Sequence, residues 1–298
     1  MKKITRVALV GGTHGNELSG IYLLKKWRDH NQFQRWPQLE LSQTIANPRA
    51  CEQSVRYIET DLNREFALDA LQDDERVGYE QLLAKKLNRQ FGPRGKSPIE
   101  LMIDLHNTTS NMGACLMLLR KDAFNIGLGA YVKANMPEAV VFFQDELPEE
   151  KKRFLISVAQ QGVTVEVGPQ PNSVLQQETL ELMERMTQHI LDFVVCYNEG
   201  SLTSLPADFE AFQYTEDLVL PTDEQGQRLG MVAKRLEQRD FQPIEPGEVV
   251  METFDGTPIT WQGNYTAYPL FINEAAYHKS HAAMTLSRRV MIRCADYL

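Results

Sequence analysis

Two short motifs carry side chains that commonly bind zinc. His14 and Glu17 stand three residues apart just after the apolar run of residues 7–10, where a helix is expected to begin. His106 directly follows a second apolar run, residues 101–105. Zinc in hydrolytic enzymes is often held by two histidines and one glutamate, with the fourth position left to water. A lone His-x-x-Glu pair often arises by chance, but with a histidine ending another strand it predicts one zinc ion on His14, Glu17 and His106.

Two acidic residues are candidates for roles beside this metal. Glu166 lies within the apolar run of residues 163–167, where a merely solvated charge is unusual. Zinc lowers the pKa of water, and a carboxylate commonly accepts the proton and passes it to the leaving nitrogen. Glu166 is therefore predicted to be the general base, and a buried acid neutralised by an arginine is the alternative. Asp104, two residues before His106, either orients that imidazole or pairs elsewhere as a buried acid.

Polar residues between the two ligand motifs could hold an anionic substrate. Asn63 and Arg64 are adjacent, and a guanidinium group offers a planar fork to a carboxylate. Arg56 could polarise the scissile carbonyl and stabilise the oxyanion that forms from it. Taken alone, each arginine could equally be a solvated charge. The nearby metal motif favours the functional interpretation.

The composition favours a globular protein with an acidic surface. The chain has 298 residues, of which 43% are hydrophobic, and a net charge of −9. This length allows one large domain, or one large and one small domain. An acidic surface repels phosphate backbones and anionic lipid, so neither nucleic acid nor membrane partners are expected. The four cysteines are far apart and no signal peptide is recognisable, which predicts reduced thiols in a cytoplasmic protein.

Short apolar runs alternate with amphipathic segments up to about residue 200. Strands are predicted at residues 7–10, 39–46, 101–105, 115–119, 140–143 and 163–167. Helices or amphipathic segments are predicted at residues 18–28, 78–91, 124–134, 153–160 and 180–197. This alternation indicates an α/β fold with a mainly parallel sheet covered by helices, in which ligands bind at the carboxyl ends of strands. The later residues are rich in Thr, Gly and Pro, so we expect a hydrolase domain over residues 1–203 and a smaller β-rich domain over residues 204–298.

Six segments resemble the aspartoacylase/succinylglutamate desuccinylase family in order and spacing. They are residues 11–18, 47–50, 61–64, 104–113, 166–171 and 273–277. The run of residues 104–113 is the most specific of them, and together they span nearly the whole chain. The resemblance implies a zinc carboxypeptidase-like fold, with the C-terminal β domain narrowing the mouth of the site.

The resemblance also implies roles for individual residues. It implies one zinc per subunit on the three predicted ligands, with Glu166 as general base and acid and Arg56 assisting the carbonyl. Asn63 and Arg64 would hold the α-carboxylate of the substrate, and Tyr277 would reach in from the second domain. The implied reaction is hydrolysis of a small N-acyl amino acid, N-acetyl-L-aspartate, to aspartate and acetate. A homodimer is compatible with the resemblance.

Two positions depart from the pattern of family members that are selective for aspartate. Those members carry an arginine ten residues before the general base and a lysine four residues after the tyrosine, where this chain has Ile156 and His281. An apolar side chain cannot offset the desolvation of a second carboxylate. The same chemistry on N-acyl aromatic, neutral or N-succinyl amino acids is therefore the alternative. A zinc-containing binding protein without catalysis is a third hypothesis, which the presence of Glu166 disfavours.

Overall fold

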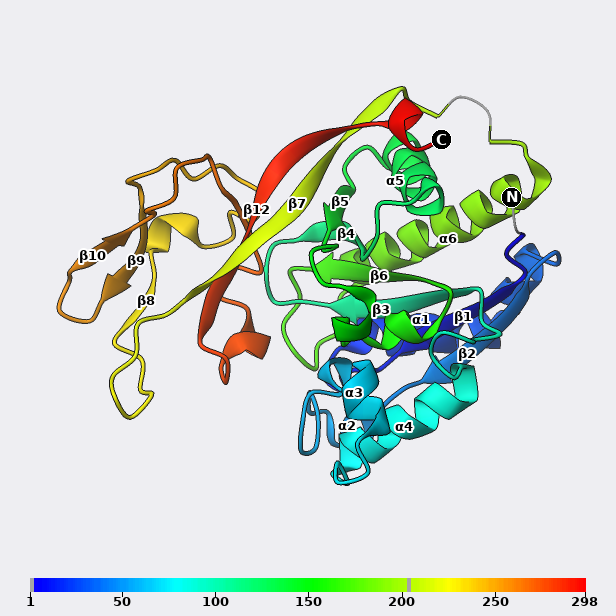
Figure 1. Ribbon diagram of the computed structural model, residues 1–298, viewed down its shortest axis with the longest axis horizontal. Helices are drawn as coiled ribbons and strands as arrows, with labels where there is room; N and C mark the ends of the chain where they lie inside the picture. The colour runs from blue at the N-terminus through cyan, green and yellow to red at the C-terminus, as the bar shows by residue number, and fades with distance from the viewer. Residues whose placement is uncertain (1–2, 203–204) are drawn as a thin grey trace.

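The computed structural model describes residues 3–202 and 205–298 (Figure 1). Among these residues, nine strands form one sheet in the order β11-β12-β7-β5-β4-β6-β3-β1-β2. Its first six strands along the chain are β1 (Arg6–Gly11), β2 (Glu40–Ile45), β3 (Leu101–Asn107), β4 (Gly113–Leu118), β5 (Val140–Phe143) and β6 (Gln161–Gly168). The helices are α1 (Leu18–Asp29), α2 (Pro48–Gln53), α3 (Leu68–Gln72), α4 (Tyr79–Phe91), α5 (Ala123–Asn135) and α6 (Gln177–Glu199).

Strand direction brings the ends of three strands to one edge of the sheet. β1 pairs in parallel with β2 and β3, and β3 pairs in parallel with β6. β4 is antiparallel to β6 and parallel to β5. The predicted α/β fold with a mainly parallel sheet is confirmed. The carboxyl ends of β1, β3 and β6 lie together, which is where ligands bind in such sheets.

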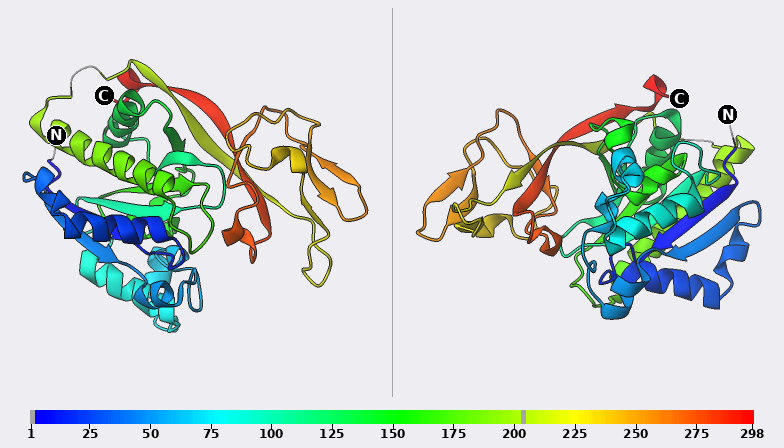
Figure 2. Two further views of the ribbon diagram at one scale, coloured as in Figure 1. Left: turned by 180° about the vertical axis from the view of Figure 1, so that it is seen from behind. Right: turned by 60° about the horizontal axis from the view of Figure 1, so that its bottom comes forward.

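Helices cover both faces of the sheet, so its central strands are apolar on both sides. All seven residues of β3 are buried. Leu9 of β1 belongs to the same core cluster as Trp27 of α1 and Met183 of α6. The next residue, Val10, points to the opposite face and joins a second cluster with Leu87 of α4. Figure 2 shows α1 and α6 in front of the sheet when it is seen from behind.

The C-terminal part is rich in β-structure, as predicted. β7 (Asp208–Val219) and β12 (Ala282–Arg293) are antiparallel, and with β11 (Tyr268–Leu270) they extend the main sheet. β8 (Gly230–Val232), β9 (Val249–Thr253) and β10 (Pro258–Thr260) form a separate three-stranded sheet. Figure 1 shows β7 and β12 as a long ribbon that leads from the main body to this second sheet. The expected boundary between residues 203 and 204 lies outside the described residues.

Some elements differ from the sequence prediction. The segment predicted as amphipathic at residues 153–160 forms only a 3-10 turn, Leu155–Val158, because its side chains fill the core cluster beneath it. β7 and β12 were not predicted, since exposed and buried residues do not alternate regularly along a twisted ribbon that leaves the main body. The short helix α2 was not predicted, because its six residues are too few to show a helical period.

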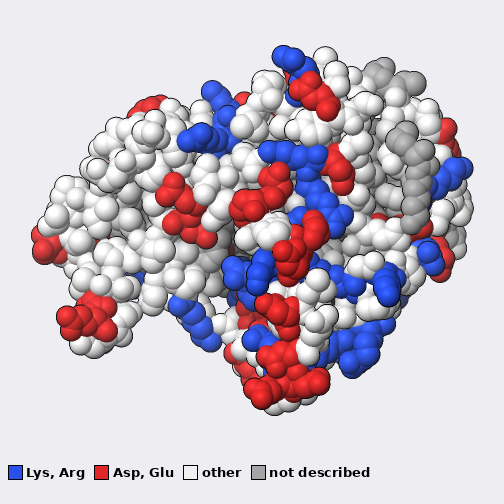
Figure 3. Space-filling model, in the orientation of Figure 1, with Lys and Arg blue, Asp and Glu red and all other residues white. Residues whose placement is uncertain are grey.

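Charge and hydropathy agree with the composition. On the face shown in Figure 3, basic and acidic side chains are mixed over the main body and form no single basic patch. Within residues 3–202 and 205–298, none of the helices combines the length and the apolar composition that a membrane span needs. All four cysteines are free thiols.

Candidate active site

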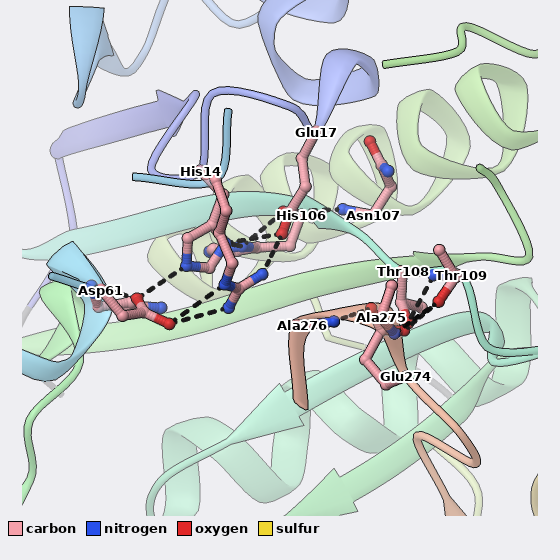
Figure 4. Close-up of polar contacts among 12 residues, drawn as sticks. His14, Glu17, Asp61, His106, Asn107, Thr108, Thr109, Glu274, Ala275 and Ala276 are labelled. Atoms are coloured by element: carbon pink, nitrogen blue, oxygen red, sulfur yellow. Dashed lines mark hydrogen bonds and ion pairs between the residues drawn. The ribbon is translucent and has the colours of Figure 1, made fainter. Parts of the chain in front are cut away.

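The three predicted metal ligands meet at the carboxyl ends of β1 and β3 (Figure 4). The Nδ1 atom of His14 lies 2.7 Å from one oxygen of Glu17, and the Nδ1 atom of His106 lies 2.9 Å from the other. The two Nδ1 atoms are 3.2 Å apart. All three side chains are buried, and their ligand atoms lie within 4.8 Å of one another. They form a buried triad that can hold a metal ion.

The loop between β1 and α1 places two of these ligands, and two glycines make its path possible. Gly12 has a φ of +65°, a left-handed conformation that favours glycine. A Cβ atom at Gly15 would lie 2.0 Å from the carbonyl carbon of Ala50. The loop is therefore packed directly against α2, with no room for a larger residue.

Each histidine has a carboxylate behind it. The Nε2 atom of His14 lies 3.0 Å from Asp61 Oδ1, and that of His106 lies 2.7 Å from Asp104 Oδ2. The other oxygen of Asp104 accepts a hydrogen bond from the Thr13 hydroxyl at 2.8 Å. A carboxylate in this position fixes the proton on Nε2 and leaves a lone pair on Nδ1. Of the two roles left open for Asp104, the geometry fits the one that orients an imidazole.

The donor set fits zinc. With Nε2 of both rings donating to a carboxylate, the Nδ1 atoms of His14 and His106 face each other with lone pairs that a cation between them would accept. Tetrahedral zinc with ligands at about 2.0–2.1 Å keeps neighbouring ligand atoms about 3.3 Å apart. The observed separation of 3.2 Å agrees with this value. Burial alone would raise the pKa of Glu17, but His14 and His106 hold it well below the usual range.

Arg56 links the metal ligands to the residues behind them. Its Nη1 donates to Glu17 Oε1 at 3.0 Å. Its Nε and Nη2 donate to Asp61 Oδ2 at 3.2 and 3.0 Å. Arg56 thus lies beside the triad and connects one of its members, Glu17, to the carboxylate of Asp61 behind His14.

Glu166, the predicted general base, lies on the strand next to His106. It is the neighbour of His106 in the register of β3 and β6. Its side chain is 8% exposed and forms no hydrogen bond or ion pair within the described part of the chain. Burial raises the pKa of Glu166 well above its ordinary value, against the opposing charges of His106 and Arg56. Among the described residues no arginine forms an ion pair with Glu166, although the charge of Arg56 is near enough to lower its pKa.

A cavity of about 420 Å³ opens onto the triad and includes every predicted site residue. These are His14, Glu17, Arg56, Asn63, Arg64, His106, Glu166 and Tyr277. Asn63 Oδ1 accepts a hydrogen bond from the Leu155 amide at 2.8 Å, which leaves the Asn63 amide group on the cavity side. Arg64 has no ion pair within the described residues, and its guanidinium lies 5.4 Å from the centre of the Phe154 ring. Its charge is therefore available for an anion.

Glu274 attaches the C-terminal segment to the loop after β3 (Figure 4). Its Oε2 accepts hydrogen bonds from the amides of Thr109 and Ser110 at 2.9 and 3.2 Å, and from the hydroxyls of Thr108, Thr109 and Ser110. Tyr277 follows three residues later and reaches the cavity from this anchored turn. The sequence prediction gave Glu274 no role, although it lies within a segment that carried the family resemblance.

Other cavity residues were not predicted. The wall contains two cations, Arg153 and Lys279, that have no ion pair among the described residues. It also contains a group of apolar side chains, namely Met117, Leu119, Phe142, Phe154 and Ile156. His281 lies outside the cavity, where Arg228 Nε donates to its Nδ1 at 3.4 Å. Arg153, like Lys152, is noticeable in the sequence as a charge close to Ile156, whereas the sequence prediction gave no role to Lys279, a charge close to His281.

Comparison with known families agrees with this geometry. The sequence model of the succinylglutamate desuccinylase/aspartoacylase catalytic domain matches residues 3–194, and that of the AstE/AspA barrel-sandwich hybrid domain matches residues 207–289. The chain belongs to the succinylglutamate desuccinylase/aspartoacylase family. It is an amidohydrolase of that family, whose members deacylate N-acyl amino acids.

The relatives of this chain are named for different activities. It is 37% identical to an aspartoacylase of Xenopus tropicalis, over 99% of this chain and 97% of the relative. It is also 37% identical to an N-acyl-aromatic-L-amino acid amidohydrolase of Rattus norvegicus, over 98% of this chain and 92% of the relative. The crystal structure of murine aminoacylase 3 superposes with a TM-score of 0.91 at 32% identity, covering 98% and 97% of the two chains. Family membership therefore establishes the chemistry but not the substrate side chain.

Proposed function

We propose that this family member is a zinc-dependent amidohydrolase that cleaves N-acetyl-L-aspartate to aspartate and acetate. The zinc would be held by Nδ1 of His14, Nδ1 of His106 and the carboxylate of Glu17. The observation that carries this proposal is the pair of Nδ1 atoms that face each other at 3.2 Å, each with a carboxylate behind its ring.

Glu166 would move the proton during hydrolysis. A bound zinc ion supplies Lewis acidity, which polarises the scissile carbonyl and activates water. Glu166 accepts a proton from the water that attacks the carbonyl carbon. It then donates that proton to the amide nitrogen as the C–N bond breaks, so the products are a carboxylic acid and a free amine. Its burial and raised pKa suit a group that must both accept and release a proton.

The substrate would be held by its α-carboxylate. Arg64 has no ion pair with an acidic residue in the described part of the chain, and Asn63 lies next to it on the cavity wall. The two therefore offer charge-assisted and neutral hydrogen bonds to one carboxylate. Arg56 lies beside the triad, where its guanidinium would stabilise the oxyanion. Tyr277 would close the site from the C-terminal segment.

Two cations in the same cavity favour a substrate that carries a second carboxylate. Arg153 lies three residues before Ile156, and Lys279 lies two residues before His281. Both belong to the cavity wall and have no ion pair in the described part of the chain. They can therefore provide positive charge near Ile156 and His281, the two positions that depart from the aspartate-selective pattern.

A second candidate is an N-acyl amino acid with a neutral or aromatic side chain. The wall formed by Met117, Leu119, Phe142, Phe154 and Ile156 favours it, because an apolar pocket binds an apolar side chain without desolvating a charge. The relative from Rattus norvegicus is named for this class of substrate.

A substrate panel tests the proposal. Steady-state kcat/KM would be measured on N-acetyl-L-aspartate, on its neutral near-isostere N-acetyl-L-asparagine and on N-acetyl-L-tyrosine. Each assay would be repeated after chelation and after zinc is restored. We expect activity only with zinc, and at least about a tenfold preference for aspartate over asparagine. A preference for N-acetyl-L-tyrosine would favour the second candidate, and full activity in the chelated enzyme would overturn the zinc mechanism.

A further inference from the structure

The buried carboxylate of Glu80, outside the cavity, accepts hydrogen bonds from the segment between Arg56 and Asp61. We propose that Glu80 is a positioning residue, which holds this segment and the metal-binding loop in register with each other. Glu80 lies in the first turn of α4, is fully buried and does not belong to the cavity wall. The inference rests on the proposed zinc site, because its consequence is the geometry of the metal ligands.

The side chain of Glu80 receives four hydrogen bonds. Three come from consecutive backbone amides: Ile58 at 2.7 Å, Glu59 at 3.0 Å and Thr60 at 3.1 Å. The fourth comes from the Asn47 side-chain amide at 3.0 Å. A loop has no ladder partner for such amides, so a carboxylate that accepts three in a row determines the path of the backbone there.

The contact is reciprocal. Glu59 Oε2 accepts a hydrogen bond from the Tyr79 amide at 2.7 Å, at the start of α4. The loop therefore caps the helix, while Glu80 of the helix holds the loop. Two opposed hydrogen-bonded groups fix both position and orientation, which a single contact would not do.

Both ends of the held segment contact metal ligands. Arg56 lies two residues before Ile58 and donates to Glu17 at 3.0 Å. Asp61 directly follows Thr60 and lies 3.0 Å from Nε2 of His14. A shift of this loop would move the guanidinium and the carboxylate together.

A second connection runs from Glu80 through Asn47 to the metal-binding loop. Asn47 is the N-cap of α2, and its Oδ1 accepts a hydrogen bond from Ala50 at 3.3 Å. Ala50 is the residue against which Gly15 packs without room for a Cβ atom. Gly15 also donates its amide to the Arg56 carbonyl at 3.3 Å. Glu80 therefore acts on both surfaces that confine the loop carrying His14.

The test compares two buried carboxylates that each accept hydrogen bonds from consecutive backbone amides. Glu80→Gln places an amide group among four donors, so at least one donor loses its acceptor. Glu100→Gln is the matched control. Glu100 is 8% exposed and accepts hydrogen bonds from the amides of Thr5 and Arg6 at 2.7 and 3.1 Å, at the opposite ends of β1 and β3. Hydrogen exchange of the metal-free proteins and zinc affinity by chelator competition would be measured for both.

We expect Glu80→Gln to speed amide exchange about tenfold at residues 12–17 as well as at 56–61, whereas Glu100→Gln leaves both segments within twofold of the wild type. Zinc affinity should fall by about 10-fold to 100-fold in Glu80→Gln alone.

Unchanged exchange at residues 12–17 in Glu80→Gln would overturn the inference. If Glu80→Gln does not fold, Glu80→Asp decides the question by the same comparison. A wild-type protein that binds no zinc would overturn the proposed function, while exchange in the metal-free chain would still decide the role of Glu80.

Discussion

Glu166 lies directly beside His106 across the β3–β6 register, so the candidate base and a metal ligand are held by the same rigid pair of strands. Neither side chain depends on a mobile loop for its position. The distance between His106 and the proposed base is therefore set by the sheet itself.

This arrangement makes the role of Glu166 testable by an isosteric change. We expect Glu166→Gln to lower kcat by about 10²-fold to 10⁴-fold, because an amide cannot accept the proton. The KM and the zinc content should stay close to those of the wild type, since Glu166 is not one of the proposed ligands. Steady-state kinetics and metal analysis would check this, and a variant that turns over at the wild-type rate would remove Glu166 from the mechanism.

Removal of the metal should destabilise the fold as well as stop turnover. A ligand that binds only the folded state stabilises it by about 2.7 kcal/mol when its free concentration is 100 times the Kd. We therefore expect the melting temperature to fall on chelation and to recover with zinc. His106→Ala serves as the control, because it should show no response to zinc. A wild-type melting temperature that is independent of zinc would contradict the proposed site.

Arg153 should determine whether a second carboxylate is accepted. Arg153→Gln is expected to lower kcat/KM for N-acetyl-L-aspartate by about tenfold or more, the loss of one charge-assisted hydrogen bond. The value for N-acetyl-L-asparagine should remain unchanged, because that substrate has no charge to pair. Equal losses on both substrates would show that Arg153 does not discriminate between them.

Glu274 should hold Tyr277 in the site. Because its carboxylate accepts hydrogen bonds from three consecutive residues, Thr108, Thr109 and Ser110, we expect Glu274→Ala to lower the free energy of unfolding by about 2–4 kcal/mol. The KM of the Glu274→Ala variant should also rise, because Tyr277 is no longer held in the cavity. Tyr277→Phe is the comparison: it should affect kinetics while leaving urea unfolding unchanged. A Glu274→Ala protein with wild-type stability would contradict this assignment.

Asp240 should make stability depend on pH. Burial raises its pKa to about 6, although the amides of Ile272 and Asn111 oppose the shift. Since the unfolded-state pKa is about 4, the contribution of this group to stability is full below about pH 4 and is lost as the pH rises through about 6. The unfolding free energy of Asp240→Asn relative to wild type should therefore increase by about 2–3 kcal/mol between pH 4 and 7. Urea unfolding across this range would measure it, and parallel pH profiles would contradict it.

The local pattern of the chain was enough to predict the main body and the three residues of the buried triad. Apolar runs predict strands, and the ends of parallel strands converge at one edge, so His14 and His106 could be expected to meet there. The same logic placed Glu166 within a strand, whereas its position beside the strand of His106 came from the sheet order. The family resemblance and the mainly parallel sheet were confirmed, since both depend on features that are continuous in the sequence.

Only the tertiary structure decided how these residues are held. Nδ1 rather than Nε2 faces the metal position because Asp61 and Asp104 lie behind the two rings. Arg153 and Lys279 reach the cavity wall from segments that are far apart in the chain. Glu80 accepts hydrogen bonds from backbone amides 20 to 22 positions away. The physical reason is that such contacts depend on side-chain direction and on packing between distant segments, and no local periodicity encodes either of them.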